Sequence, residues 1–254
     1  MNNKDEATHN STVDFGYQKV APKQKTELVD EVFKRVADRY DVMNDLMSLG
    51  THRVFKRMLV EMAGLRPGHT VLDLAGGTGD VSALLASLVG STGQVILADP
   101  NPEMIRVGRD RLLDEGLAQV QFCQAYGEAL PFKDATFDAA SISFGLRNFT
   151  SKHEGLTEIL RVLKPGAALV VLEFSKPQNP ALEAAYGLFQ NLWPGAGQVL
   201  VGDSEPYQYL VESIRVHPDQ KALKLMFEDA GFTDVVYHDL VGGIAAIHRG
   251  TKPL

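Results

Sequence analysis

The stretch Val71-Leu72-Asp73-Leu74-Ala75-Gly76-Gly77-Thr78-Gly79-Asp80 decides the fold, because it reads as a buried strand, a glycine turn and the start of a helix. A second apolar strand, 94–98, ends at Asp99. Glycines at a strand-to-helix turn let a ligand approach the backbone, and the helix N-terminus adds N–H donors. An acidic residue about 20 positions further on reaches ribose hydroxyls. The two stretches predict a nucleoside-cofactor site at the carboxyl edge of a parallel sheet.

The acidic residue that closes the first strand indicates which nucleoside cofactor binds. The dinucleotide pattern G-x-G-x-x-G/A is met only in part, since Ser82 stands where a third glycine is needed. A carboxylate at Asp73 would repel a pyrophosphate but suits a cation. S-adenosylmethionine carries an ammonium and a sulfonium and no phosphate. The pattern therefore favours S-adenosylmethionine, and it resembles that of the class I methyltransferases that use this cofactor.

Composition excludes several classes of protein. The chain has 254 residues and a net charge of −7, so a nucleic acid would bind against the global field. Cys123 is the only cysteine, which rules out an intrachain disulfide and favours a reducing compartment. Residues 1–10 lack the apolar stretch of a signal peptide, and the apolar run at 167–172 is too short to span a bilayer. We expect a cytoplasmic protein.

The alternation of apolar strands and amphipathic helices predicts an α/β fold with a doubly wound, mostly parallel, seven-stranded, Rossmann-like sheet. Two strand-like runs near the end, 233–240 and 243–249, are spaced as an antiparallel hairpin at the sheet edge. The remaining strands are expected at 70–74, 94–98, 119–123, 137–142 and 167–173, and helices at 52–63, 79–89, 102–115, 153–163 and 218–230.

We expect three regions along the chain. Residues 1–25 form a partly disordered N-terminal segment, 26–66 a helical lid, and 67–254 the cofactor-binding core. Within the lid, Tyr40 and Asp41 are expected to shape the substrate site.

An insertion at about 176–217 contains a helical pattern over 181–193, with aromatic residues on one face. That helix either packs on the core or caps an apolar substrate. Tyr186, Phe189 and Trp193 lie on this face.

Several stretches closely resemble the signatures of the ubiquinone/menaquinone biosynthesis C-methyltransferases, the UbiE family. The similarity covers about residues 14–250, and Phe55, Ala167 and Tyr126-Gly127 depart from the family pattern. The resemblance implies C-methylation of a polyprenyl benzoquinol in ubiquinone synthesis and of demethylmenaquinol in menaquinone synthesis. The stretches that carry it are 40–53, 143–148, 161–166, 172–175 and 212–220.

The resemblance also implies which residues bind S-adenosylmethionine. Thr78 lies in the glycine turn, Asp99 ends the second strand, and Ser143 follows the fourth strand, beside the reacting methyl. Tyr126 and Gly127 follow the third strand, where backbone N–H groups can meet the adenine ring. The reading of the glycine turn itself adds Asp73, Gly77 and Gly79.

The reaction needs an electron-rich ring carbon aligned with the sulfonium methyl in a dry pocket. The resemblance places Arg147 and Asn148 at the reaction centre. An arginine is too basic to accept a proton easily, so we expect Arg147 to stabilise the developing phenolate and Asn148 to orient a water. His52 and His217 are candidate bases because of the usual pKa range of histidine.

The sequence has no His/Cys cluster at metal-ligand spacing, so we expect no metal site. The expected partners are the polyprenyl quinol substrate and other quinone-biosynthesis proteins, with no nucleic acid. Because the substrate is lipid-soluble, transient contact with the inner face of the cytoplasmic membrane is expected through Tyr186, Phe189 and Trp193, as a peripheral protein.

Four alternatives remain open. An NAD-dependent oxidoreductase is disfavoured by Asp73 and the missing third glycine. A nucleic-acid methyltransferase of the exocyclic-amine kind would carry Asn/Asp-Pro-Pro-aromatic where this chain has 143–146. A non-catalytic S-adenosylmethionine binder is also compatible with the sequence. So is an O- or N-methyltransferase that acts on another apolar molecule.

Overall fold

The computed structural model of the chain describes residues 12–36, 44–45, 48, 50–200, 202 and 204–254. Tyr40 and Asp41 lie outside the described residues. Within the described part, no helix is long and apolar enough to cross a membrane.

Seven strands form the central sheet, in the order β5-β4-β3-β6-β7-β9-β8. Strands β3 to β7 pair in parallel, whereas β9 runs antiparallel to both β7 and β8. The predicted doubly wound sheet with an antiparallel C-terminal hairpin is therefore confirmed. The strand bounds are Thr70–Leu74 (β3), Gln94–Asp99 (β4), Val120–Gln124 (β5), Phe137–Ser143 (β6), Leu163–Phe174 (β7), Thr233–Leu240 (β8) and Ala245–Thr251 (β9).

Helices cover both faces of the sheet, as the alternation of side chains along each strand requires. Val71 belongs to a core cluster with Leu59 of α3 and Leu85 of α4, whereas Leu72 belongs to one with residues of α6 and α10. The helix bounds are Pro22–Val36 (α1), His52–Met62 (α3), Asp80–Val89 (α4), Pro102–Asp114 (α5), Lys152–Val162 (α6), Pro180–Gln190 (α7), Trp193–Leu200 (α8), Glu205–Val216 (α9) and Gln220–Asp229 (α10).

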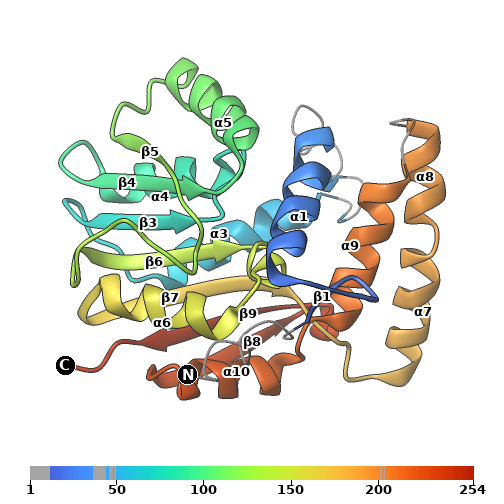
Figure 1. Cartoon of the computed structure of the whole chain (residues 1–254). Helices are drawn as coiled ribbons and strands as arrows, with labels where there is room; N and C mark the ends of the chain where they lie inside the picture. Colours follow the sequence, from blue (N-terminus) through green and yellow to red (C-terminus); the bar gives the residue numbers. More distant parts are fainter. Residues whose placement is uncertain (1–11, 37–43, 46–47, 49, 201, 203) are drawn as a thin grey trace, which may run out of the picture.

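The strand order reverses at β3, because β4 lies on one side of it and β6 on the other. In open α/β sheets, ligands bind outside the carboxyl ends of the strands at such a switch point. Helices α1, α7, α8 and α9 gather beyond these ends (Figure 1). The fold therefore brings the glycine turn and a layer of helices to the same edge.

A short hairpin precedes α1 and lies against α9. It consists of β1 (Val13–Phe15) and β2 (Gln18–Val20), which pair antiparallel. The ring of Phe15 stacks on Tyr209 with centroids 4.5 Å apart, and the N–H of Tyr17 donates to Glu212 over 3.1 Å. These contacts join the start of the described chain to the insertion.

Among the strands, β7 and β9 differ most from the prediction in where they begin. Strand β7 begins at Leu163, earlier than expected, because Leu163 pairs with Phe137 across the sheet. Strand β9 begins at Ala245, two residues late, because residues 241–243 form a 3-10 turn with positive φ angles.

The insertion also differs, since α7 ends at Gln190 and a separate helix begins at Trp193. Its aromatic face is turned inward: Trp193 is 3% exposed, and the rings of Tyr186 and Phe189 pack edge-on against it. The face expected to touch a membrane therefore packs on a core cluster with α9. The exposed apolar side chains of this region are on other positions, Leu188 and Leu192.

Candidate functional site

The glycine turn joins β3 to α4 in a conformation that side chains would obstruct. Gly77 and Gly79 have φ angles of +56° and +87°, and Gly79 is the N-cap of α4. A Cβ atom on Gly79 would lie 2.6 Å from a methyl group of Leu112. The glycine at position 79 therefore serves both the left-handed turn and the packing of α5 against it.

Asp99, at the end of β4, is held by the backbone of the turn. One carboxylate oxygen accepts the N–H of Gly77 over 3.0 Å, and the other accepts the N–H of Asn101 over 2.9 Å. Burial raises the pKa of Asp99 to about 6, and these two backbone donors oppose the shift. Each oxygen keeps a second lone pair, so this carboxylate can still accept ribose hydroxyls.

Asp73, on β3, is equally buried but is held by hydroxyl groups. Ser82 donates to one of its oxygens over 2.6 Å and Ser141 to the other over 2.9 Å. Burial raises the pKa of Asp73 to about 6, and Lys56 is among the groups that lower it. Ser82, the residue that breaks the dinucleotide pattern, is thus a hydrogen-bond partner of the acidic residue that precedes the turn.

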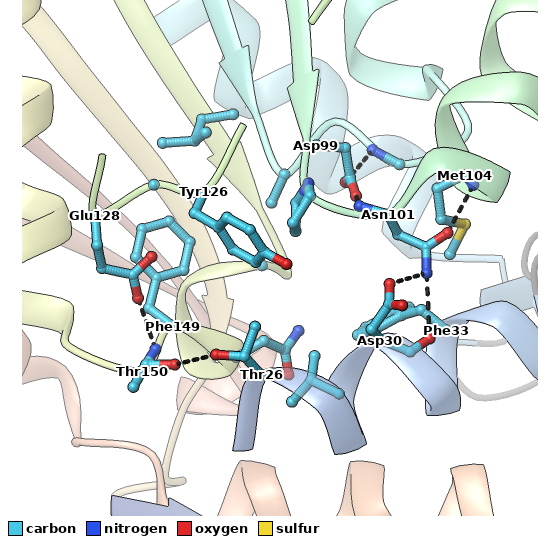
Figure 2. Close-up of a pocket in the computed structure, with 18 of the residues that line it drawn as sticks. Thr26, Asp30, Phe33, Asp99, Asn101, Met104, Tyr126, Glu128, Phe149 and Thr150 are labelled. Atoms are coloured by element: carbon cyan, nitrogen blue, oxygen red, sulfur yellow. Dashed lines mark hydrogen bonds between the residues drawn. The ribbon is translucent and has the colours of Figure 1, made fainter. Parts of the chain in front are cut away.

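A cavity opens beside Asp99, and α1 forms one of its walls. We call it the cofactor cavity. Asp30 of α1 accepts a hydrogen bond from the Asn101 side chain over 2.7 Å, and the Thr26 and Thr150 hydroxyls lie 3.3 Å apart (Figure 2). These contacts join the helix to both rims. The lining also includes Val29, Phe33, Leu74, Ala75, Pro100, Met104, Gly127, Glu128, Phe144, Gly145, Asn148 and Phe149.

Tyr126 and Gly127, which follow the third core strand, line the same cavity. Figure 2 shows Tyr126 between the Glu128 and Asp99 groups, and its side chain is 48% exposed. A Cβ on Gly127 would lie 2.2 Å from the ring of Phe149. Only a glycine at position 127 leaves room for the Phe149 ring, whereas Tyr126 lies at the opening of the cofactor cavity.

A smaller hollow, the turn cavity, continues from the glycine turn. Asp73, Thr78 and Ser143 line it together with Lys56. The hydroxyl of Ser143 is buried and has no hydrogen-bond partner among the described residues. A buried orphan hydroxyl is unusual in a native fold, and here it marks a place where a bound ligand can supply the missing hydrogen bond.

Phe144 borders three cavities. It lines the cofactor cavity, the turn cavity and a third cavity of about 310 Å³, which we call the apolar cavity. The apolar cavity lies between α3, α7 and the turn before β9. Its lining is Ser48, Thr51, Phe55, Phe144, Phe174, Leu182, Tyr186, Phe189, Val241, Ile244 and Ala245.

Arg147 is buried behind this junction and is paired with Glu173 at the end of β7. Its guanidinium lies 2.9 Å from the Glu173 carboxylate, donates to the carbonyl of Phe144, and lies 5.7 Å from the centroid of the Phe174 ring. The neighbouring Asn148 lines the cofactor cavity and accepts the Tyr209 hydroxyl over 3.0 Å. Arg147 and Asn148 are neighbours in the sequence, but their side chains therefore have different surroundings in the fold.

The two histidines singled out in the sequence are not brought together. His217 lines a fourth cavity with Arg147, and burial lowers its pKa well below the ordinary value. His52 bonds Asp45 over 2.8 Å and lines a hollow with Arg53, and it is not among the residues that line the apolar cavity. Burial also lowers the pKa of His52.

Sequence reasoning missed the residues of α1 and two polar partners. Asp30 and Phe33 carry no motif, and only the folded chain places them against the cofactor cavity. Asn101 could have been found, because Asn-Pro before a helix is a capping signal, and its side chain does accept two N–H groups of α5. Glu173 lies in the stretch 172–175, and nothing in the sequence indicates its ion pair with Arg147. Among the described residues, no group of three or more His, Cys, Asp or Glu side chains could hold a metal ion.

Comparison with known proteins places this geometry in a family. The profile of the ubiE/COQ5 methyltransferase family matches residues 17–252. A relative from Ectopseudomonas mendocina (strain ymp) is named ubiquinone/menaquinone biosynthesis C-methyltransferase UbiE; it is 55% identical, over 95% of each chain. A protein of the same name from Pseudomonas putida (strain W619) is 53% identical, over 100% of each chain.

Solved structures agree on the fold. A SAM-dependent methyltransferase from Aquifex aeolicus is 20% identical over 92% of this chain and 100% of that chain, with a TM-score of 0.58. The [4+2]-cyclase SpnF is 17% identical over 96% of this chain and 100% of that chain, with a TM-score of 0.62. Since one of these proteins is a cyclase, the likeness supports the fold and leaves the reaction to the site residues.

Proposed function

We propose that this chain, which belongs to the ubiE/COQ5 methyltransferase family, transfers a methyl group from S-adenosylmethionine to a ring carbon of a polyprenyl benzoquinol or of demethylmenaquinol. It is a C-methyltransferase of ubiquinone and menaquinone biosynthesis. The observation that carries the proposal is the meeting of the cofactor, turn and apolar cavities at Phe144. A polar donor and an apolar acceptor can approach each other only at such a junction.

The residues around the glycine turn fit S-adenosylmethionine. Asp99 has free lone pairs for the ribose hydroxyls, and Tyr126 and Gly127 border the space for adenine. Thr78 and the orphan hydroxyl of Ser143 would bind the methionine end, beside the Asp73 carboxylate. When bound, the cofactor supplies an electrophilic methyl group on a sulfonium, whose positive charge the two carboxylates favour.

The apolar cavity suits the quinol ring and the beginning of its isoprenoid chain. Aromatic side chains line it from three elements: Phe55 of α3, Phe174 of β7 and Phe189 of α7. They exclude water from the ring carbon and orient it toward Phe144, which raises the rate by alignment. Burial of such apolar surface is also what holds a lipid-soluble substrate away from the membrane.

Arg147 supplies the fixed positive charge for this step. Its guanidinium lies over the ring of Phe174, which lines the apolar cavity, and Glu173 holds it in place. The buried guanidinium stabilises the deprotonated phenolic oxygen and so keeps the ring carbon nucleophilic. That carbon takes the methyl group as the methyl–sulfur bond breaks, S-adenosylhomocysteine is the leaving group, and the ring carbon then loses its proton. Asn148 would orient a water that carries the phenolic proton, and its side-chain oxygen is anchored by Tyr209. His217 lies near Arg147 in a separate cavity, and we assign His52 no chemical step.

The test is Arg147→Ala, assayed with reduced and oxidised quinone. We expect kcat to fall by about 10²–10³, as for removal of one buried electrostatic stabiliser. Binding of S-adenosylhomocysteine, measured by calorimetry, should be retained, which also shows that the variant folds. Arg147→Lys is the matched control and should recover part of kcat. Equal methylation of the oxidised quinone would sink the mechanism.

Contact with a membrane is proposed at α7 and α8, where the substrate would enter. Leu188 and Leu192 are 71% and 66% exposed, close to residues that line the apolar cavity. Leu188→Glu with Leu192→Glu should reduce co-sedimentation with phosphatidylcholine vesicles. The control is Leu113→Glu, on α5, which is 55% exposed and far from this region in the chain. Unchanged co-sedimentation would remove α7 and α8 from the proposal.

A further inference from the structure

A fourth cavity, of about 330 Å³, lies between the β1 hairpin, the N-terminus of α6 and the C-terminus of α9. It shares only Thr150 with the lining of the cofactor cavity. We call it the basic cavity, because Lys25, Arg147 and Lys152 line it. None of the steps proposed above places the cofactor or the quinol in it.

The two lysines of the basic cavity have few partners. Lys25 is 3% exposed, and its ammonium donates to the carbonyl of Phe149 over 2.7 Å. Lys152 has no hydrogen bond or ion pair with any described residue. Burial and the charge of Lys152 together lower the pKa of Lys25 to about 8.

Asp14 lines the cavity, Glu173 and Glu128 lie near it, and each of these carboxylates has a partner other than Lys25 and Lys152. Asp14 pairs with Lys19 over 2.6 Å, and Glu173 pairs with Arg147 over 2.9 Å. Glu128 accepts the N–H of Thr150 over 2.7 Å. The positive charges of Lys25, which is buried, and of Lys152, which is half-buried, are therefore left without a contacting counter-charge among the described residues. An unpaired charge is costly for a group that is shielded from water.

Two features of the cavity that carry no full charge also favour binding of an anion. The N-terminus of α6, which is 11 residues long, begins at Lys152 and contributes the positive end of its dipole. His217 is 2% exposed, and neither ring nitrogen has a hydrogen-bond partner among the described residues. A buried histidine that is short of both partners calls for a ligand or a water.

We propose that the basic cavity binds a phosphate group. Its charge, between −1 and −2 near neutral pH, balances the two lysines, and its oxygens accept hydrogen bonds from the ammonium groups and from His217. The phosphate is either free in solution or the head group of an anionic lipid. The chemistry of the site is the same for both sources.

A ligand bound in the basic cavity would affect the cofactor cavity through the loop after β6. Lys25 holds Phe149, and Thr150 borders both cavities and contacts Thr26 of α1. A bound phosphate would fix Lys25 and so stabilise α1 over the cofactor. We therefore expect phosphate to tighten binding of S-adenosylhomocysteine.

The experiment is calorimetric titration of the full chain with inorganic phosphate. Lys152→Met should weaken phosphate binding by about tenfold or more, because one charge-assisted contact is lost. Lys133→Met, at an exposed loop position, should have no effect. Lys25→Met gives a second variant and should also weaken phosphate binding. An unchanged thermal unfolding midpoint, measured by circular dichroism, shows that each variant is folded.

Phosphatidylcholine vesicles with and without phosphatidic acid distinguish the two sources. Recruitment that needs phosphatidic acid and is lost in Lys152→Met identifies a lipid head group. Binding of inorganic phosphate without recruitment identifies a free ion. Absence of both, or equal binding by the wild type and Lys152→Met, would overturn the proposal.

Discussion

The cofactor edge and the acceptor side of this site are built in opposite ways. At the cofactor edge, both oxygens of Asp99 accept backbone N–H groups, and both oxygens of Asp73 accept hydroxyls. On the acceptor side, the apolar cavity of about 310 Å³ is lined mainly by aromatic and aliphatic side chains and offers few polar groups. The first region is organised by the fold before any ligand arrives, whereas the second is completed by what binds there.

The difference has an energetic side. Burial raises the pKa of both aspartates to about 6, so their ionised forms are maintained at a cost in stability. A protein keeps such buried charge where function requires it. Variants therefore fall into two groups. One group disturbs the cofactor edge, which the fold builds in advance, and the other, such as Arg147→Ala, disturbs the acceptor side.

The largest effect on the cofactor edge should come from Asp99→Ala. The variant leaves the N–H groups of Gly77 and Asn101 without their acceptor and removes the proposed partner of the ribose. We expect S-adenosylhomocysteine to bind about 100-fold more weakly, or about 3 kcal/mol, the cost of losing hydrogen bonds to a charged group. Calorimetry measures it, with Asp114→Ala, at an exposed position of α5, as control. Wild-type affinity would show that Asp99 does not bind the ribose.

A smaller effect concerns the pH dependence of stability. The pKa of Asp73 is raised in the folded state to about 6, so its stabilising contribution is present below about pH 4 and is lost as pH rises through 6. Asp73→Asn should therefore flatten the fall in unfolding free energy over this range, by about 1–3 kcal/mol. Chemical denaturation at several pH values measures the change.

Asp138 provides a control of opposite sign. The Lys164 side chain and the N–H of Thr70 hold the pKa of Asp138 below its ordinary value, although burial opposes them. Its contribution is present at neutral pH and is lost on acidification, so Asp138→Asn should destabilise the protein mainly above pH 4. The same slope in both variants would contradict the assigned pKa shifts.

The smallest effect should come from Tyr126→Ala. The side chain is 48% exposed and lines the cofactor cavity, while the backbone of this segment borders the space proposed for adenine. We expect KM for S-adenosylmethionine to rise only a few-fold, less than about 1 kcal/mol. A rise of more than about 30-fold would mean that the phenol ring itself binds adenine.

The fold and the cofactor edge could be predicted because their signals are local. The glycines, Asp73 and Asp99 lie within about 30 residues of one another, and their geometry follows from two strands and one turn. The inward face of α7 could not be predicted, since an aromatic stripe looks the same on a core helix and on a membrane-facing one. Only the packing of Trp193 against α9 decides between them.

The sequence by itself determined the parallel sheet, the glycine turn and the pair of acidic residues that suit a cationic adenosine derivative. Each of these features depends on residues that are close together in the chain. Over such short distances, the periodicity of strands and helices and the chemistry of turns decide the structure. The tertiary structure alone decided that Asp30 of α1 meets Asn101, that Arg147 is paired with Glu173, and that three cavities meet at Phe144. Those contacts join residues far apart in the chain, so they exist only when the core brings their elements together.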